Sequence, residues 1–146
     1  MKIGFDGKRA VQNFTGLGNY SRYIADILCH FCPENEYVLY APQKRNNKRL
    51  DILTEKYPQL HLSYPAASFW RKFSSLWRIF GITHQLEKEN ASIFHGLSNE
   101  LPLNIHKSDI KSVVTIHDLI FLRYPQYYHF IDRKIYTYKF RKACEN

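Results

Sequence analysis

Two histidines stand where the sequence predicts that β-strands end. His117 follows the β-branched run 112–116, and His95 closes the short run 92–95. A histidine at such a position can hydrogen-bond a sugar hydroxyl or move a proton near neutral pH, although a single histidine more often has a structural role. Asp118 either orients the ring of His117 or caps the turn that follows it. His117 and Asp118 are therefore the candidate catalytic residues.

Two glycine-containing segments are candidate binding loops: residues 15–19 (Thr-Gly-Leu-Gly-Asn) before an amphipathic segment, and residues 95–99 (His-Gly-Leu-Ser-Asn) after a predicted strand. Glycines let a backbone approach a ligand closely, and free amides at a helix start favour an anion. The alternatives are a flexible helix entry and an ordinary turn. The candidate donor- or acceptor-binding residues are Gly16, Leu17, Gly18, Asn19, His95, Gly96, Ser98 and Asn99.

The first of these segments differs from the two common nucleotide-binding motifs. It is not a dinucleotide-binding fingerprint, because Ser21 replaces the third glycine and the loop after the first strand is too long. It is not a P-loop either, because no Gly-Lys-Ser/Thr follows.

Residues 68–80 combine aromatic and basic side chains at helical spacing. That composition is typical of a helix that lies on a membrane surface. The alternative is a core helix with a basic outer face. The candidates for contact with a membrane or a lipid acceptor are Trp70, Arg71, Phe73, Trp77 and Arg78.

Strands and helices alternate along the chain, as judged from apolar residues at period 2 and at period 3.6. The expected strands are 2–6, 36–41, 60–64, 92–95 and 112–116, and the expected helices are 20–31, 50–57, 68–80, 83–89 and 130–143, with a polar loop over 7–15. This alternation predicts an α/β fold of one domain, Rossmann-like and three-layered (αβα), with a mainly parallel sheet. Ligands of such folds bind beyond the carboxyl ends of the strands.

The composition is that of a folded, basic protein. The 146 residues include 21 Lys and Arg against 13 Asp and Glu, a net charge of +8, and 45% are hydrophobic, which argues against disorder. The charge suits an anionic membrane surface, whereas no nucleic-acid-binding motif is present and no nucleic-acid partner is expected. No apolar run approaches the roughly 20 residues of a membrane span, and the first residues do not resemble a signal peptide. We expect a cytoplasmic protein, or a peripheral one on the inner face of the plasma membrane.

The three cysteines predict neither a disulfide framework nor a metal centre. Cys29 and Cys32 have C-x-x-C spacing, but a second pair of zinc ligands is missing. They also close a predicted helix, where the helix dipole does not favour a thiolate. Together with Cys144 they are expected to be small apolar residues, and no cofactor and no metal is expected.

Four segments in order resemble one enzyme family. They are Lys-Ile-Gly-Phe-Asp-Gly at 2–7, Thr-Gly-Leu-Gly-Asn-Tyr at 15–20, His-Gly-Leu-Ser-Asn-Glu-Leu-Pro at 95–102 and Val-Val-Thr-Ile-His-Asp-Leu at 113–119. Their order and spacing resemble the N-terminal, acceptor-side domain of family 4 (group 1) glycosyltransferases. These are retaining GT-B enzymes of bacterial polysaccharide and glycolipid synthesis. The resemblance covers residues 1–146, nearly the whole chain.

The resemblance implies an enzyme that moves a hexosyl group from a nucleotide-sugar to a glycan or lipid-linked acceptor, in a cleft between two Rossmann-like halves. Gly16 and Gly18 match the family's glycine loop near the donor phosphates, and His117 matches a histidine that faces the transferred sugar. The nucleotide-binding C-terminal domain and its E-x7-E pair are absent from these residues. We therefore expect the chain to be a fragment that does not transfer sugar alone.

Two other interpretations stay open. The first is a stand-alone, non-catalytic α/β binding module that forms a homodimer through the exposed cleft face or binds an anionic surface. The second is a flavodoxin-like nucleotide-binding protein, which is weakened by the lack of a phosphate loop directly after the first strand.

Overall fold

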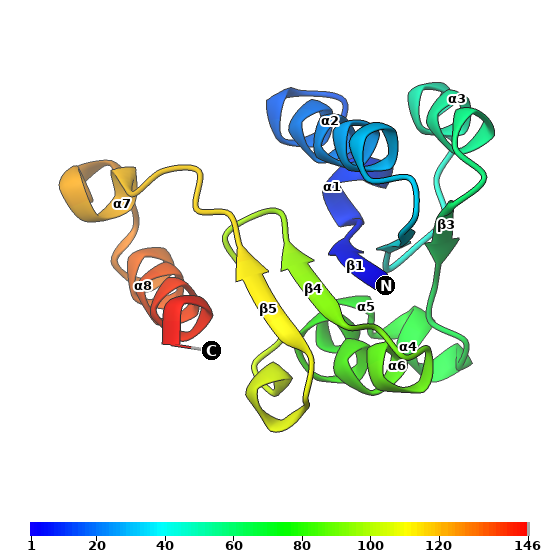
Figure 1. Cartoon of the computed structure of the whole chain (residues 1–146). Helices are drawn as coiled ribbons and strands as arrows, with labels where there is room; N and C mark the ends of the chain where they lie inside the picture. The colour runs from blue at the N-terminus through cyan, green and yellow to red at the C-terminus, as the bar shows by residue number, and fades with distance from the viewer. Residues whose placement is uncertain (146) are drawn as a thin grey trace.

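The computed structural model describes residues 1–145, which fold around one β-sheet (Figure 1). The sheet is five-stranded and parallel throughout, in the order β3-β2-β1-β4-β5. The strands are β1 (Lys2–Asp6), β2 (Glu36–Tyr40), β3 (Leu60–Ser63), β4 (Ile93–Gly96) and β5 (Lys111–Val114). The predicted Rossmann-like α/β class is therefore confirmed.

Helices cover both faces of this sheet, as Figure 1 shows. One layer contains α1 (Lys8–Gln12), α2 (Gly16–Phe31) and α3 (Lys48–Lys56). The other contains α4 (Ser68–Lys72), α5 (Ser74–Leu76), the π-helical turn η1 (Trp77–Gly81) and α6 (Ile82–Lys88). The 3-10 turn η2 (Ile105–Lys107) precedes β5; on the outer side of β5 lie α7 (Ile120–Arg123), the 3-10 turn η3 (Pro125–Tyr127) and α8 (Phe130–Glu145).

The sheet separates two hydrophobic cores, because successive side chains of a strand point to opposite faces. Phe5 and Leu39 pack beneath the layer of α1–α3. Val38 and Tyr40 pack on the other face with Trp77 of η1. Full burial of a Val, Leu or Phe side chain contributes about 1.5–3 kcal/mol to the stability of the fold. The cores hold the sheet between its helices and fix the edge where the strands end.

Two segments differ from the expected elements. Residues 8–12, expected in a loop, form α1, whose Ala10 and Val11 are fully buried. Residues 68–80, expected as one helix, are interrupted at Phe73, where φ is −110° and ψ is 52°. The chain then continues through α5 into the wider turn η1, and Trp77 enters the core. Four apolar side chains of this segment, Phe69, Phe73, Leu76 and Phe80, are exposed.

Candidate functional site

The order of the strands reverses between β1 and β4. From β1 the chain builds outward to β2 and β3, and then returns to the other side of β1 to form β4 and β5. Loops at such a reversal point diverge at the carboxyl ends of the strands and leave a crevice for a ligand. The residues at this edge are Asp6 at the end of β1, His95 and Gly96 at the end of β4, and Thr115 just after β5.

His95 belongs to a chain of polar side chains that joins three elements. Its Nε2 lies 2.8 Å from the Oγ1 of Thr115, which lies 3.1 Å from the hydroxyl of Tyr20 in α2. Burial lowers the pKa of His95, because a charged imidazole would lose its hydration there. The ring is therefore neutral at pH 7 and acts as a hydrogen-bonding group. The sequence analysis did not name Tyr20 and Thr115 as site residues. Thr115 could have been found as a hydroxyl residue at the end of an expected strand.

Two residues of the turn after β4, Leu97 and Asn99, hold His117 in position by hydrogen bonds. Its Nε2 lies 2.9 Å from the carbonyl oxygen of Leu97, and its amide donates to the Oδ1 of Asn99 at 2.8 Å. A carbonyl oxygen only accepts, so Nε2 carries a proton, and in the tautomer with one ring proton Nδ1 is the acceptor. Tyr20 packs edge-on against the ring with the centroids 4.9 Å apart. Within residues 1–145 no hydrogen bond occupies Nδ1, which is therefore available to a ligand hydroxyl.

The turn after β4 positions these groups. Asn99 adopts the left-handed conformation with φ 61°, which asparagine tolerates better than most residues. A Cβ on Gly96 would lie 2.1 Å from the carbonyl oxygen of Glu100, so the turn requires glycine. Ser98 is buried at the same turn. The predicted segment 95–99 thus comes together with His117 at one edge of the sheet, largely through its backbone.

The start of α2 is built from close backbone contacts. A Cβ on Gly18 would lie 1.9 Å from the carbonyl oxygen of Asn13, so only glycine fits there, whereas a Cβ on Gly16 would meet nothing within 4 Å. The Oδ1 of Asn13 accepts from the amides of Thr15 and Gly18. Among the described residues no cap reaches the amides of Gly16 and Leu17, which are open to an outside acceptor.

Two of the predicted site residues, Asn19 and Asp118, form hydrogen bonds with other residues of the protein. The Oδ1 of Asn19 accepts from the guanidinium groups of Arg22 and Arg49, so this side chain joins α2 to α3, and its assignment as a binding residue stays a prediction. The Oδ1 of Asp118 accepts from the amide of Ile120 in the turn that leads into α7. It therefore matches the turn-capping alternative, and the orientation of the His117 ring comes from Leu97 instead.

A buried group of charges lies on the opposite side of the same edge. Arg78 of η1 forms ion pairs with Asp6 and, at 3.3 Å, with Glu100; Glu100 in turn pairs with Lys139 of α8 at 2.9 Å. Burial opposes the charged form of Arg78, but Asp6 and Glu100 outweigh it and raise its pKa. Burial, aided by Arg78, lowers the pKa of Lys8 nearby. Sequence reasoning missed the acidic partners; the signal was Asp6 at the end of the central strand.

The predicted membrane contacts are corrected for two residues. Trp77 is 1% exposed and lies in the core, and Arg78 is held in its ion pairs, so neither can reach a membrane. Trp70 is partly buried against the same core. Arg71 donates to the carbonyl oxygens at positions 65 and 66, and Phe73 is exposed. Beyond the interruption at Phe73, Trp77 and Arg78 turn toward the interior, whereas Leu76 and Phe80 are exposed.

No helix in residues 1–145 is both long and apolar enough to cross a membrane. In the same residues no group of three or more His, Cys, Asp or Glu side chains is arranged to hold a metal ion. Cys29 is buried, Cys32 is partly buried and Cys144 is exposed, and all three are free thiols.

Comparison of the chain with protein-family models, curated proteins and solved structures found no match. The side chains and amides of the site itself therefore indicate which ligand it suits. At one edge of the sheet these are an available ring nitrogen on His117, the hydroxyls of Tyr20 and Thr115, and two amides of α2. Such groups suit a hydroxyl-rich ligand that also carries an anion.

Proposed function

We propose that this chain is the acceptor-side domain of a retaining GT-B glycosyltransferase, which moves a hexosyl group from a nucleotide-sugar to a glycan or lipid-linked acceptor. The observation that carries the proposal is the fixed His117, with Nε2 held by Leu97 and Nδ1 available at the carboxyl edge of the sheet. The resemblance of the segments 2–7, 15–20, 95–102 and 113–119 to family 4 glycosyltransferases supports it.

In the proposed reaction the bond from the sugar C1 to the diphosphate oxygen breaks, and a bond from C1 to the acceptor oxygen forms on the same face. The acceptor proton passes to the departing phosphate oxygen, so no protein nucleophile is required. Nδ1 of His117 accepts a hydrogen bond from a hydroxyl of the transferred sugar. The amides of Gly16 and Leu17 face the diphosphate, where preorganised donors stabilise the developing charge.

The donor nucleotide needs a second domain in this proposal. The family's E-x7-E pair does not occur in these 146 residues, whose glutamates include no two that are eight positions apart. We therefore expect no sugar transfer by the chain alone and transfer when a matching nucleotide-binding domain is supplied. Measurable transfer by the purified 146-residue chain would contradict this division of roles.

Ligand-observed NMR with a panel of oligosaccharides and nucleotide-sugars tests the proposal on the isolated chain. We expect the hexosyl group of a nucleotide-sugar to bind weakly and His117→Ala to weaken that binding about tenfold, which corresponds to one hydrogen bond of about 1.4 kcal/mol. The matched control is His106→Ala, an exposed histidine of η2 that precedes β5. Equal binding by both variants, or no binding of any carbohydrate, would overturn the proposal.

A homodimeric binding module is the second candidate, and the exposed side of β5 favours it. Val113 of this edge strand is 48% exposed, and Leu119, Leu122 and Tyr127 beyond it are also exposed. An edge strand beside exposed apolar side chains is a common site of association. Light scattering after size-exclusion chromatography decides between the candidates: a stable dimer that binds no carbohydrate favours the module, and a monomer that binds carbohydrate favours the glycosyltransferase domain.

A further inference from the structure

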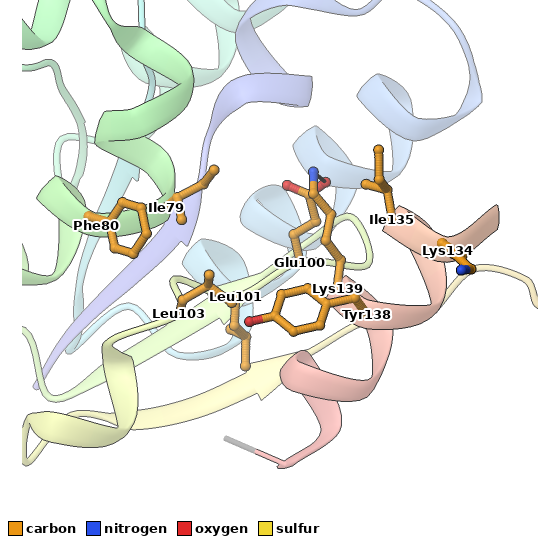
Figure 2. A pocket seen from close by; sticks show the side chains of 9 residues that line it. All are labelled: Ile79, Phe80, Glu100, Leu101, Leu103, Lys134, Ile135, Tyr138 and Lys139. Carbon is orange, nitrogen blue, oxygen red and sulfur yellow. Dashed lines mark hydrogen bonds and ion pairs between the residues drawn. The ribbon is translucent and has the colours of Figure 1, made fainter. Parts of the chain in front are cut away.

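A pocket of about 390 Å³ lies between η1, the loop after β4 and α8 (Figure 2). Its volume falls within the range of small-molecule sites, roughly 300–1,000 Å³. In Figure 2, side chains of η1 lie across the opening from side chains of α8, and the loop residues lie between them. The apolar lining consists of Ile79, Phe80, Leu101, Leu103, Ile135 and Tyr138.

The charge at the rim of this pocket is cationic. Lys134, Lys139 and Glu100 complete the lining. Glu100 is already compensated, because Lys139 and Arg78 both pair with it. The amino group of Lys134 lies 4.5 Å from the centroid of the Phe130 ring, and no carboxylate in residues 1–145 forms an ion pair with it. The rim therefore presents one cation that an anionic ligand group can pair with.

An exposed apolar stripe runs along the chain to this pocket. Phe69 and Phe73 pack against each other with ring centroids 4.9 Å apart, and Leu76 and Phe80 come later in the sequence, beyond the interruption at Phe73. All four side chains are more than 40% exposed. Phe80 belongs both to the stripe and to the pocket wall. Exposed apolar side chains that gather in one part of a surface mark an interaction site.

We propose that the pocket binds the hydrocarbon chain of a single-chain anionic amphiphile, with the headgroup beside Lys134. The apolar walls remove the chain from water, and the uncompensated amino group of Lys134 selects the charge of the headgroup. This binding goes beyond the proposed sugar transfer and does not depend on it, because it requires neither His117 nor a second domain. An exposed apolar surface alone, or a cation alone, would not select such a ligand. The pocket combines apolar walls with one cation at its rim.

Isothermal titration with alkyl phosphates below their micelle concentrations tests this proposal. We expect one dodecyl phosphate to bind per chain, with the affinity rising about three- to fourfold for each methylene that enters the pocket. Octyl phosphate is then at least tenfold weaker, and inorganic phosphate does not bind measurably at the same site. Equal affinity for octyl and dodecyl phosphate, or several molecules bound per chain, would overturn the proposal.

Variants of α8 supply the matched control. Ile135→Asp places a charge in the pocket wall and is expected to weaken dodecyl phosphate binding at least tenfold. Ile131→Asn changes an exposed isoleucine one turn away that does not line the pocket, adds no carboxylate beside Lys134, and is expected to bind as the unchanged protein does. Both residues are largely exposed, so both variants should fold, which circular dichroism checks. Equal weakening by the two variants would show that binding is non-specific adsorption to α8.

The headgroup is tested through Lys134. Lys134→Gln is expected to weaken dodecyl phosphate about fivefold and to leave dodecyl maltoside, a neutral amphiphile, unaffected. Arg141→Gln, on the same helix and outside the pocket, controls for the loss of one positive charge. If Lys134→Gln and Arg141→Gln weaken dodecyl phosphate binding equally, Lys134 does not recognise the headgroup.

Discussion

The guanidinium group of Arg78 is ion-paired with the carboxylate of Asp6, although the two residues are 72 positions apart in the sequence. The pair joins η1 to the end of β1, and the side chains of Arg78 and Asp6 are 13% and 5% exposed. A residue expected at a membrane surface is therefore part of the interior next to the candidate site. The pair holds one wall of the crevice in place.

Removal of one partner of this pair should destabilise the fold strongly. Asp6→Asn leaves the charge of Arg78 buried with only Glu100 beside it, and we expect a loss of about 3 kcal/mol in the free energy of unfolding. The control is Glu36→Gln, which removes an exposed pair with Lys2 and should cost less than about 1 kcal/mol. Urea denaturation measures both. Similar losses in the two variants would mean that the Arg78 pair contributes no more than a surface pair.

The buried His95 should make stability depend on pH. Because burial lowers the pKa of His95 in the folded protein, the unfolded chain binds the proton more readily. Stability is therefore complete above the unfolded pKa of about 6.5 and falls as the pH drops below it. His95→Gln should flatten the change in unfolding free energy between pH 7 and pH 5.5, while His106→Gln, at an exposed position, should not. An unchanged slope in His95→Gln would contradict the assignment.

The two glycines of α2 should respond in opposite ways to alanine. Gly18→Ala forces a methyl group against the backbone of Asn13, and we expect a loss of about 2 kcal/mol. Gly16→Ala meets open space at the first helical position, and the restricted unfolded chain should stabilise the protein by up to about 1 kcal/mol. Thermal unfolding of the two variants gives the comparison. Equal melting temperatures would refute the close contact of Gly18.

The three cysteines should differ in reactivity. Burial raises the pKa of the Cys29 thiol to about 11, so at pH 8 it is both inaccessible and protonated. Cys144 is exposed and should react with a thiol reagent first, whereas Cys29 should react only after unfolding in urea. Mass spectrometry of the labelled chain identifies the sites, and Cys144→Ser should remove the fast phase. Fast labelling of Cys29 in the native protein would instead favour a reactive C-x-x-C pair.

The exposed stripe should attach the chain to anionic vesicles. We expect flotation with anionic vesicles at low salt, because electrostatic attraction is strongest there, and loss of flotation at high salt. Phe73→Asp should reduce flotation at least fivefold, because Phe73 is 42% exposed within the stripe. The control is Phe31→Asp at the end of α2, where the side chain is 73% exposed. No flotation at low salt would remove membrane contact from the proposed function.

The sequence alone determined the α/β class and predicted the edge of the sheet at which the candidate site lies. Alternating β-branched residues and the amphipathic run 20–31 are local patterns, and local patterns fix strands and helices with few competing solutions. Once parallel strands are inferred, their carboxyl ends must lie at one edge. His95 and His117 could therefore be assigned to that edge before any contact was known.

Only the tertiary structure decided which groups face the edge and which face the core. Helical periodicity over 68–80 could not reveal the interruption at Phe73, because a single backbone conformation there reassigns every later side chain, Trp77 and Arg78 included. The partner of His117 could not be read from the sequence either. Every residue has a carbonyl oxygen, and only the position of Leu97 in the fold places its oxygen beside the His117 ring. Contacts between distant residues depend on packing, and packing is decided by the whole chain.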